Sequence, residues 1–238
     1  MALREVGVEM THMLCELIMK ELKALGDPKI AEAMARFGIF TNAYGVPMPQ
    51  MKKIGKRVGK DHNLAQELWQ TTIYEARVVA SIDDPNMVTE EQLEEWAKDF
   101  DNWAICDNCC SILFDKTVFA YKKAVEWSIR EEEYVKRAGF VIIAVLAVHD
   151  KKASDDVFLK FLETIKYGAA DNRNFVKKAV NWALRQIGKR NFRLNNVAIA
   201  TANEIHKMES SSAKWIATNA IRELKSPAVP SEKMAEQY

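Results

Sequence analysis

The sequence predicts an all-α fold, an α-solenoid in which stacked helix pairs line a concave face. Apolar residues recur at the helical period in nearly every segment, and no alternating β-branched run stands between turn signals. Glycine and proline are scarce, with 9 and 6 among 238 residues. Short motifs also return after roughly 40 residues, the spacing of stacked helix pairs. Together these observations favour a chain that is helical throughout.

The first half of the chain divides at turn signals. Gly26 ends the first helix, and Pro28 suits the first position of the next. Gly and Pro residues mark a loop over 38–49, and Thr89 with Gln92 forms the capping box of a later helix. The helices expected in this half span residues 4–24, 28–37, 50–58, 64–70, 73–82 and 89–98.

The second half continues with helices and short turns. Asp171 is expected to cap one of these helices, and Gly188 to take the left-handed conformation that ends it. The apolar stripe of that helix consists of Val176, Ala179, Val180, Ala183, Leu184 and Ile187. The helices expected in this half span residues 102–114, 117–130, 132–148, 154–167, 172–187, 195–208 and 211–224.

Two motifs repeat at the period of HEAT-like solenoids. Val-Lys-Arg-Ala at Val135 returns 41 residues later as Val-Lys-Lys-Ala at Val176. Ala-Leu-Arg-Gln at Ala183 returns 37 residues later as Ala-Ile-Arg-Glu at Ala220. Helix pairs of this length are typical of HEAT-like repeats. We predict one HEAT-like domain over residues 1–225 and a polar C-terminal tail over 226–238.

The charge of the chain is nearly balanced but unevenly distributed. The formal net charge is +1, from 34 basic and 33 acidic residues. Acidic residues gather over 89–101 and 131–133, and basic residues over 52–60 and 177–190. Such concentration can build a cationic face on a chain of low net charge.

The sequence gives no signal for a membrane, a secretory route or a metal. No apolar run reaches the length of a membrane span, and the first residues do not form a signal peptide. Three of the four cysteines crowd into 106–110, where framework disulfides are awkward. Cys106 and Cys109 have metal-ligand spacing, but no second pair follows. We expect a cytoplasmic protein without bound metal.

The polar flank of the helix over 172–187 indicates a nucleic-acid partner. Trp182 lies there among three cations, Lys178, Arg185 and Lys189. An indole ringed by basic side chains suits a polyanion whose sugars or bases can stack on it. A scaffold for a protein partner is the alternative, because solenoid repeats and low net charge also suit that role.

A second helix carries a tryptophan away from its aliphatic stripe. Trp103 and Asp107, one turn apart, lie opposite Ile105 and Cys109. A packed indole and a solvated carboxylate are the ordinary explanation for such residues. The occurrence of two such helices favours a shared functional role.

Arg137 stands in an otherwise apolar helix over 132–148 and is therefore expected to be buried with a partner. The 41-residue repeat puts it at the position of Lys178. A pair with Asp107, a bidentate phosphate contact and a purely structural ion pair are all open roles.

In these motifs the chain resembles the AlkD-like DNA alkylation repair proteins, which are HEAT-like repeat DNA glycosylases. The resemblance covers most of the chain and is carried by residues 44–47, Pro49, 51–54, 103–107, 135–138 and 174–191. It implies a site of two tryptophans and an aspartate, Trp103, Trp182 and Asp107, supported by Arg137. It also implies excision of cationic N3- or N7-alkylated purines from duplex DNA, approached from the backbone side, without a metal or organic cofactor.

The chemistry of these side chains agrees with the resemblance. An alkylated purine is already a cationic leaving group, so the positive charge developing on the deoxyribose is what needs stabilising. Indole faces and a carboxylate can stabilise that charge. We expect a monomer that binds alkylated duplex DNA and no membrane, with phosphate contacts from Arg137, Lys178, Arg185, Lys189 and Arg190. A module that binds branched or damaged DNA without catalysis is the second interpretation.

Overall fold

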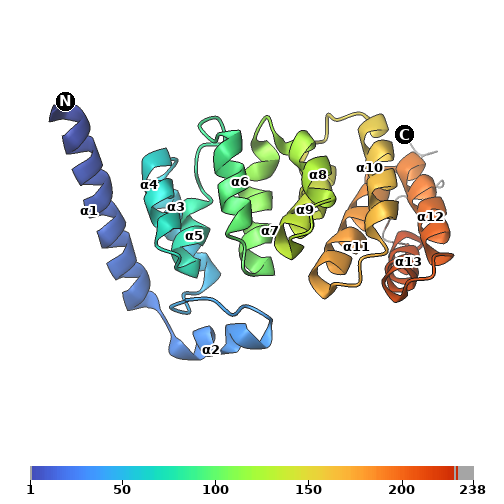
Figure 1. Cartoon of the computed structure of the whole chain (residues 1–238), viewed down its shortest axis with the longest axis horizontal. Coiled ribbons are helices and arrows are strands. Elements are labelled where there is room, and N and C mark those ends of the chain that lie inside the picture. Colours follow the sequence, from blue (N-terminus) through green and yellow to red (C-terminus); the bar gives the residue numbers. More distant parts are fainter. Residues whose placement is uncertain (1, 228, 230–238) are drawn as a thin grey trace. The chain divides into compact units, whose positions relative to one another are not determined.

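The structure is a computed structural model that describes residues 2–227 and 229. Over these residues it contains thirteen α-helices, one 3₁₀ helix and no strand, which confirms the predicted all-α class. The helices form two compact units, Met1–Val118 and Phe119–Tyr238 (Figure 1). None of the described helices is both long and apolar enough to cross a membrane.

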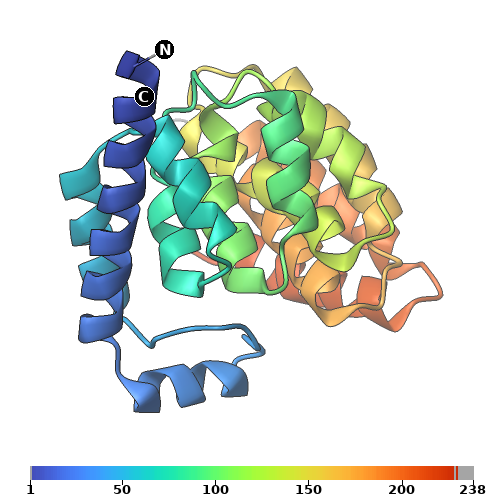
Figure 2. The same ribbon diagram turned by 60° about the vertical axis from the view of Figure 1, so that its left-hand side comes forward.

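The first unit is built around the short helix α5 (Tyr74–Ala80), whose seven residues are all buried. Helix α5 packs against the neighbouring helices α1, α3, α4 and α7. From α1, the chain turns into α2 and a loop before it returns to the body of the unit (Figure 2). The other helices are α1 (Ala2–Leu25), α2 (Pro28–Arg36), α3 (Met48–Val58), α4 (His62–Gln70), α6 (Glu90–Lys98) and α7 (Trp103–Ile112), followed by η1 (Phe114–Lys116).

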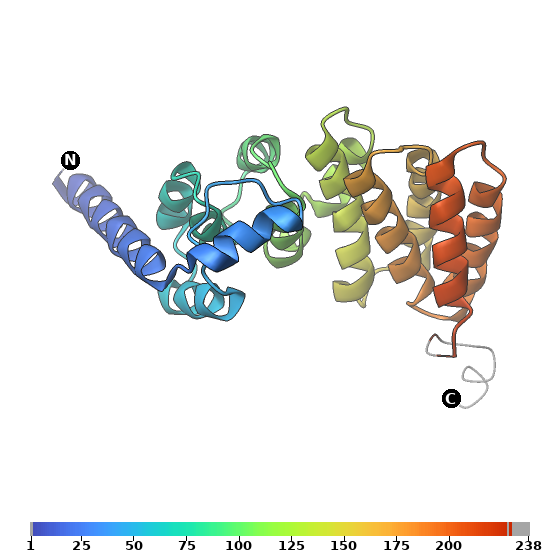
Figure 3. The ribbon, with the colours of Figure 1, turned by 90° about the horizontal axis from the view of Figure 1, so that it is seen from below.

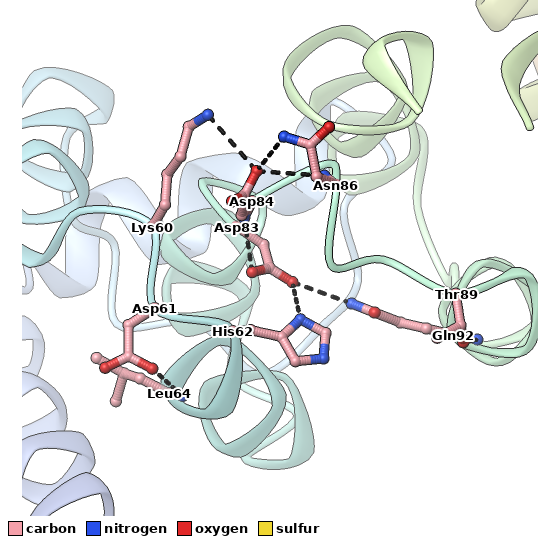
Figure 4. A network of polar contacts seen from close by, with 9 residues as sticks. All are labelled: Lys60, Asp61, His62, Leu64, Asp83, Asp84, Asn86, Thr89 and Gln92. Atoms are coloured by element: carbon pink, nitrogen blue, oxygen red, sulfur yellow. Dashed lines mark hydrogen bonds and ion pairs between the residues drawn. The ribbon is translucent and has the colours of Figure 1, made fainter. Parts of the chain in front are cut away.

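A buried carboxylate ties three parts of the first unit together (Figure 4). The Asp83 Oδ2 atom lies 2.9 Å from His62 Nδ1 and accepts a hydrogen bond from Gln92 Nε2 at 3.2 Å. Its Oδ1 atom accepts from the Asp84 amide at 2.7 Å. The capping box is therefore only half formed, because Thr89 accepts from the Gln92 amide while the Gln92 side chain binds Asp83.

The second unit consists of three helix pairs, α8 with α9, α10 with α11 and α12 with α13, and Figure 3 shows them side by side. The second helices of the pairs, α9, α11 and α13, form one layer, and α10 contacts both α8 and α12 in the other. This arrangement realises the repeat seen in the sequence. The helices are α8 (Ala120–Ser128), α9 (Glu133–His149), α10 (Asp155–Gly168), α11 (Asn174–Gly188), α12 (Phe192–His206) and α13 (Ser211–Leu224).

Both predicted end signals of α11 are wrong. The N-cap is Arg173, and the Asp171 carboxylate instead forms ion pairs with Arg173 and with Lys136 of α9. Gly188 is the last helical residue and is not left-handed. It is needed for packing, because a Cβ there would lie 2.6 Å from Leu224 Cδ2.

Of the predicted tail over 226–238, residues 228 and 230–238 lie outside the described residues. The single domain over 1–225 stays a prediction.

Candidate functional site

Trp103 is the first residue of α7 and is half-buried. Its indole Nε1–H donates to the Phe37 carbonyl at 2.8 Å, so the residue that follows α2 helps fix the ring. Asn102 caps the helix by accepting from the amides of Ala104 and Ile105, each at 3.0 Å. The candidate indole is thus held both by its helix end and by a distant loop.

Asp107 lies one turn after Trp103 on the same helix and is also half-buried. The cysteines around it, Cys106, Cys109 and Cys110, are buried free thiols. Burial raises the pKa of Cys109 and Cys110 well above the usual thiol value, and the charge of Asp107 adds to the rise at Cys110. Cys109 and Cys110 are therefore neutral packing groups rather than nucleophiles.

The loop after α2 is held by a buried glutamate that the sequence interpretation missed. Glu75 of α5 is 0% exposed. Its carboxylate accepts hydrogen bonds from the consecutive backbone amides of Tyr44, Gly45 and Val46, with N···O distances of 3.0, 2.7 and 3.1 Å. Gly45 has φ +80°, and a Cβ there would lie 2.1 Å from the Asp27 carbonyl oxygen. The motif over 44–47 thus encodes an anchored loop. Its only local sequence signal was the glycine and proline content.

This loop borders an open, polar cleft of about 580 Å³ in the first unit. Phe37 and Phe40 on the loop are 70% and 78% exposed. Asp101, which lines the cleft, stands shortly before Trp103 in the sequence. The Phe37 carbonyl, which accepts the hydrogen bond of the Trp103 indole, belongs to the loop that borders the cleft. Its lining residues are Ala31, Ala35, Ile39, Phe40, Thr41, Asn42, Thr72, Arg77 and Asp101.

In the second unit, Trp182 lies on α11 and is half-buried. The predicted apolar stripe on the other flank is confirmed, because all six of its residues are 0% exposed. Lys178, one turn before Trp182, is exposed to solvent. Helix α11 therefore presents an indole and a cation on the side away from its core.

Arg137 is buried, as expected, with 5% of its surface exposed. Its guanidinium donates to the Phe175 carbonyl of α11 at 2.6 Å. Because Phe175 lies in the first turn of α11, this bond joins α9 to the helix that carries Trp182.

The remaining predicted cations have partners within the second unit. Arg185 and Lys189 both form ion pairs with Glu223 of α13. Burial raises the pKa of Glu223, but hydrogen bonds from Lys189 and Arg185 outweigh it and hold the pKa below its usual value. The Arg190 guanidinium donates hydrogen bonds to the carbonyls of Ala147, Asp150 and Ala153. Its Cζ atom also lies 3.9 Å from the centroid of the Phe158 ring.

Comparisons with known proteins agree with this architecture. A solved structure from "a new family of proteins related to the HEAT-like repeat DNA glycosylases with affinity for branched DNA structures" is similar to the chain, with a TM-score of 0.72 and 22% identity. The match covers 87% of this chain and 94% of that chain, which confirms the predicted HEAT-like fold. No curated protein matches the chain significantly. The family model described as DNA alkylation repair enzyme matches residues 18–224, and the chain therefore belongs to the DNA alkylation repair enzyme family.

Proposed function

We propose that this protein is a DNA glycosylase that excises cationic N3- or N7-alkylated purines from duplex DNA. The proposal assigns Trp103, Asp107 and Trp182 as catalytic residues in a cytoplasmic monomer that uses no metal or organic cofactor. One observation carries it: in a chain of this family, α7 holds a half-buried, hydrogen-bonded indole one turn from a half-buried carboxylate.

The proposed reaction breaks the bond between C1′ of the deoxyribose and the alkylated purine nitrogen. The bonding electron pair leaves with the base and neutralises its positive charge, so no general acid is required. The indoles of Trp103 and Trp182 stabilise the developing sugar cation through their π faces. The Asp107 carboxylate stabilises the same charge and orients the attacking water, whose oxygen bonds to C1′ as its proton is released. The products are the free base and an abasic site.

Contacts to the DNA backbone are assigned to the cations of the second unit. Lys178 is the best placed of these because its side chain is exposed to solvent. Arg185, Lys189 and Arg190 are assigned supporting contacts, and Arg137 is assigned the support of the site from α9. Contacts to phosphates fix the duplex without reading its sequence.

The test is release of methylated base from a duplex containing N7- or N3-methylpurine. Wild-type protein is expected to release base, Asp107→Asn and Trp103→Ala to lose roughly 100-fold or more of the single-turnover rate, and Trp103→Phe to keep part of it. The matched control is Tyr167→Ala, which removes an exposed aromatic from α10. Release by wild type no faster than by Asp107→Asn would sink the proposal.

A non-catalytic binder of branched DNA is the second candidate function. The similarity to a structure from a family with affinity for branched DNA favours it. This function predicts equal junction affinity for wild type and Asp107→Asn together with no base release by either protein.

A further inference from the structure

Trp215 on α13 is an indole without an assigned role in the proposed reaction. It is 40% exposed, whereas Trp69, Trp96 and Trp127 are at most 1% exposed. The helix that carries it is well packed, because Ile216, Ala217 and other residues of its inner face are fully buried. An exposed indole on a rigid helix is typical of a binding surface, since its large apolar face has one polar edge.

The position of Trp215 is fixed by a ladder of pairs between α11 and α13. Each pair joins a residue of α11 to the residue 38 positions later, and successive pairs are one helical turn apart. The Lys177 ammonium lies 5.1 Å from the Trp215 ring centroid, Asn181 Nδ2 donates to Asn219 Oδ1 at 2.9 Å, and Arg185 pairs with Glu223. Trp215 is therefore held against α11 at one end of this row of paired residues.

The sequence repeat places Trp215 at the position on α13 that the exposed candidate DNA contact Lys178 occupies on α11. Arg137, Lys178 and Trp215 occupy equivalent positions on α9, α11 and α13, at spacings of 41 and 37 residues. The Lys177 ammonium accompanies the ring, and the next residue, Lys178, is exposed to solvent. An aromatic face beside cations matches the chemistry of a nucleotide, which offers a base to stack and a phosphate to neutralise.

We propose that Trp215 and Lys177 bind an unpaired base and its phosphate in single-stranded or branched DNA. Bases inside a duplex have both faces covered by their neighbours, whereas an unpaired base has a face free to stack on this ring. The site would therefore distinguish a fork or flap from a continuous duplex. This inference rests on the proposed function as a DNA-binding protein, and it adds a second contact beyond the catalytic residues.

The experiment compares the binding of wild type and Trp215→Ala to a blunt duplex and to the same duplex with a single-stranded flap. We expect Trp215→Ala to weaken flap binding about tenfold, in line with the loss of one base stack, and duplex binding less than about twofold. Lys177→Gln should reduce the salt dependence of flap binding by about one counterion. A 2-aminopurine in the flap should be quenched on binding to wild type and not to Trp215→Ala.

Two controls keep the result interpretable. Tyr167→Ala removes another exposed aromatic, 71% exposed on α10, and should bind both DNAs as wild type does. Trp215→Phe should keep most of the flap affinity. Equal affinity of Trp215→Ala and wild type for the flap, or equal losses on flap and duplex, would overturn the assignment. A wild-type protein that binds neither DNA would instead refute the proposed function.

Discussion

Asp171 shows how one side chain stabilises the turn before α11. Its carboxylate accepts from the Arg173 side chain and lies 3.1 Å from the Lys136 ammonium of α9. The Arg173 guanidinium also donates to the Glu131 carbonyl, so the cluster joins two helix pairs. Burial raises the pKa of Asp171, but the hydrogen bonds from Arg173 and Lys136 outweigh it and hold the pKa at about 2.

Asp171→Asn is expected to lower the free energy of unfolding by about 2 kcal/mol at pH 7. Because the pKa of the folded state lies below that of the unfolded chain, the stabilisation is complete above about pH 4 to 5. It is lost as the pH falls toward 2, where the carboxylate is protonated in both states. Denaturant unfolding at several pH values measures the difference in the free energy of unfolding between wild type and Asp171→Asn. A difference that stayed constant between pH 3 and pH 7 would contradict this account.

The arginines of the second unit illustrate what a local pattern leaves out. Helical periodicity placed Arg185 beside Trp182, and the basic stretch made Arg190 a candidate phosphate contact, but neither pattern contained a sign of their partners. Arg190 binds carbonyls 37 to 43 residues away, and Arg185 pairs with Glu223, 38 residues away. Contacts over such separations depend on how helices pack, which a single helix pattern does not encode.

At the scale of elements, α2 and its loop depend on Glu75. The three amides it accepts hold the loop to α5, and the residue after α2 binds the Trp103 indole. Helix α2 itself contains no buried residue, so its position depends on these polar contacts and on its cap at Asp27. Anchoring of the loop is therefore linked to the orientation of the candidate catalytic indole.

Glu75→Gln is expected to cost about 3 kcal/mol of unfolding free energy, because it removes a charged acceptor from buried amides. If the protein releases methylated base, the rate should fall about tenfold as the loop loosens its hold on Trp103. Denaturant unfolding and single-turnover kinetics check the two effects. Glu9→Gln, which changes an exposed glutamate of α1, serves as the control and should alter neither.

The positions of the helices could be predicted because each helix has a regular apolar stripe. The residues that end each helix were harder to predict. All thirteen expected helices occur within a few residues of their predicted positions. The errors at Asp171 and Gly188 came from applying capping rules to residues that serve packing and ion pairing between helices. Of the candidate site, the burial of Arg137 and the two flanks of α11 followed from the pattern, while the support of Trp103 by Phe37 did not, since it spans 66 residues.

At the scale of the whole molecule, the charge balance affects the proposed binding of DNA. The net charge of +1 hides a cationic region whose members Arg185 and Lys189 are both paired with Glu223. A phosphate that reaches either cation must replace a carboxylate, so the net electrostatic gain is smaller than for a free cation.

Glu223→Gln is expected to tighten the binding of undamaged duplex several-fold and to steepen its salt dependence, because both cations become available to phosphates. Titrations at several salt concentrations measure this. Lys178→Ala should have the opposite effect on the salt dependence, lowering it by about one counterion. Weaker duplex binding by Glu223→Gln would show that the glutamate orders the two cations rather than competing for them.

If the protein acts on DNA as proposed, the glutamate that Arg185 and Lys189 share affects how it searches a genome. A surface whose positive groups are already occupied by its own anion has a short residence time on ordinary DNA, so it can move quickly from one stretch to the next. In the proposed glycosylase, only a site that offers further attractive contacts would hold the protein long enough for base excision.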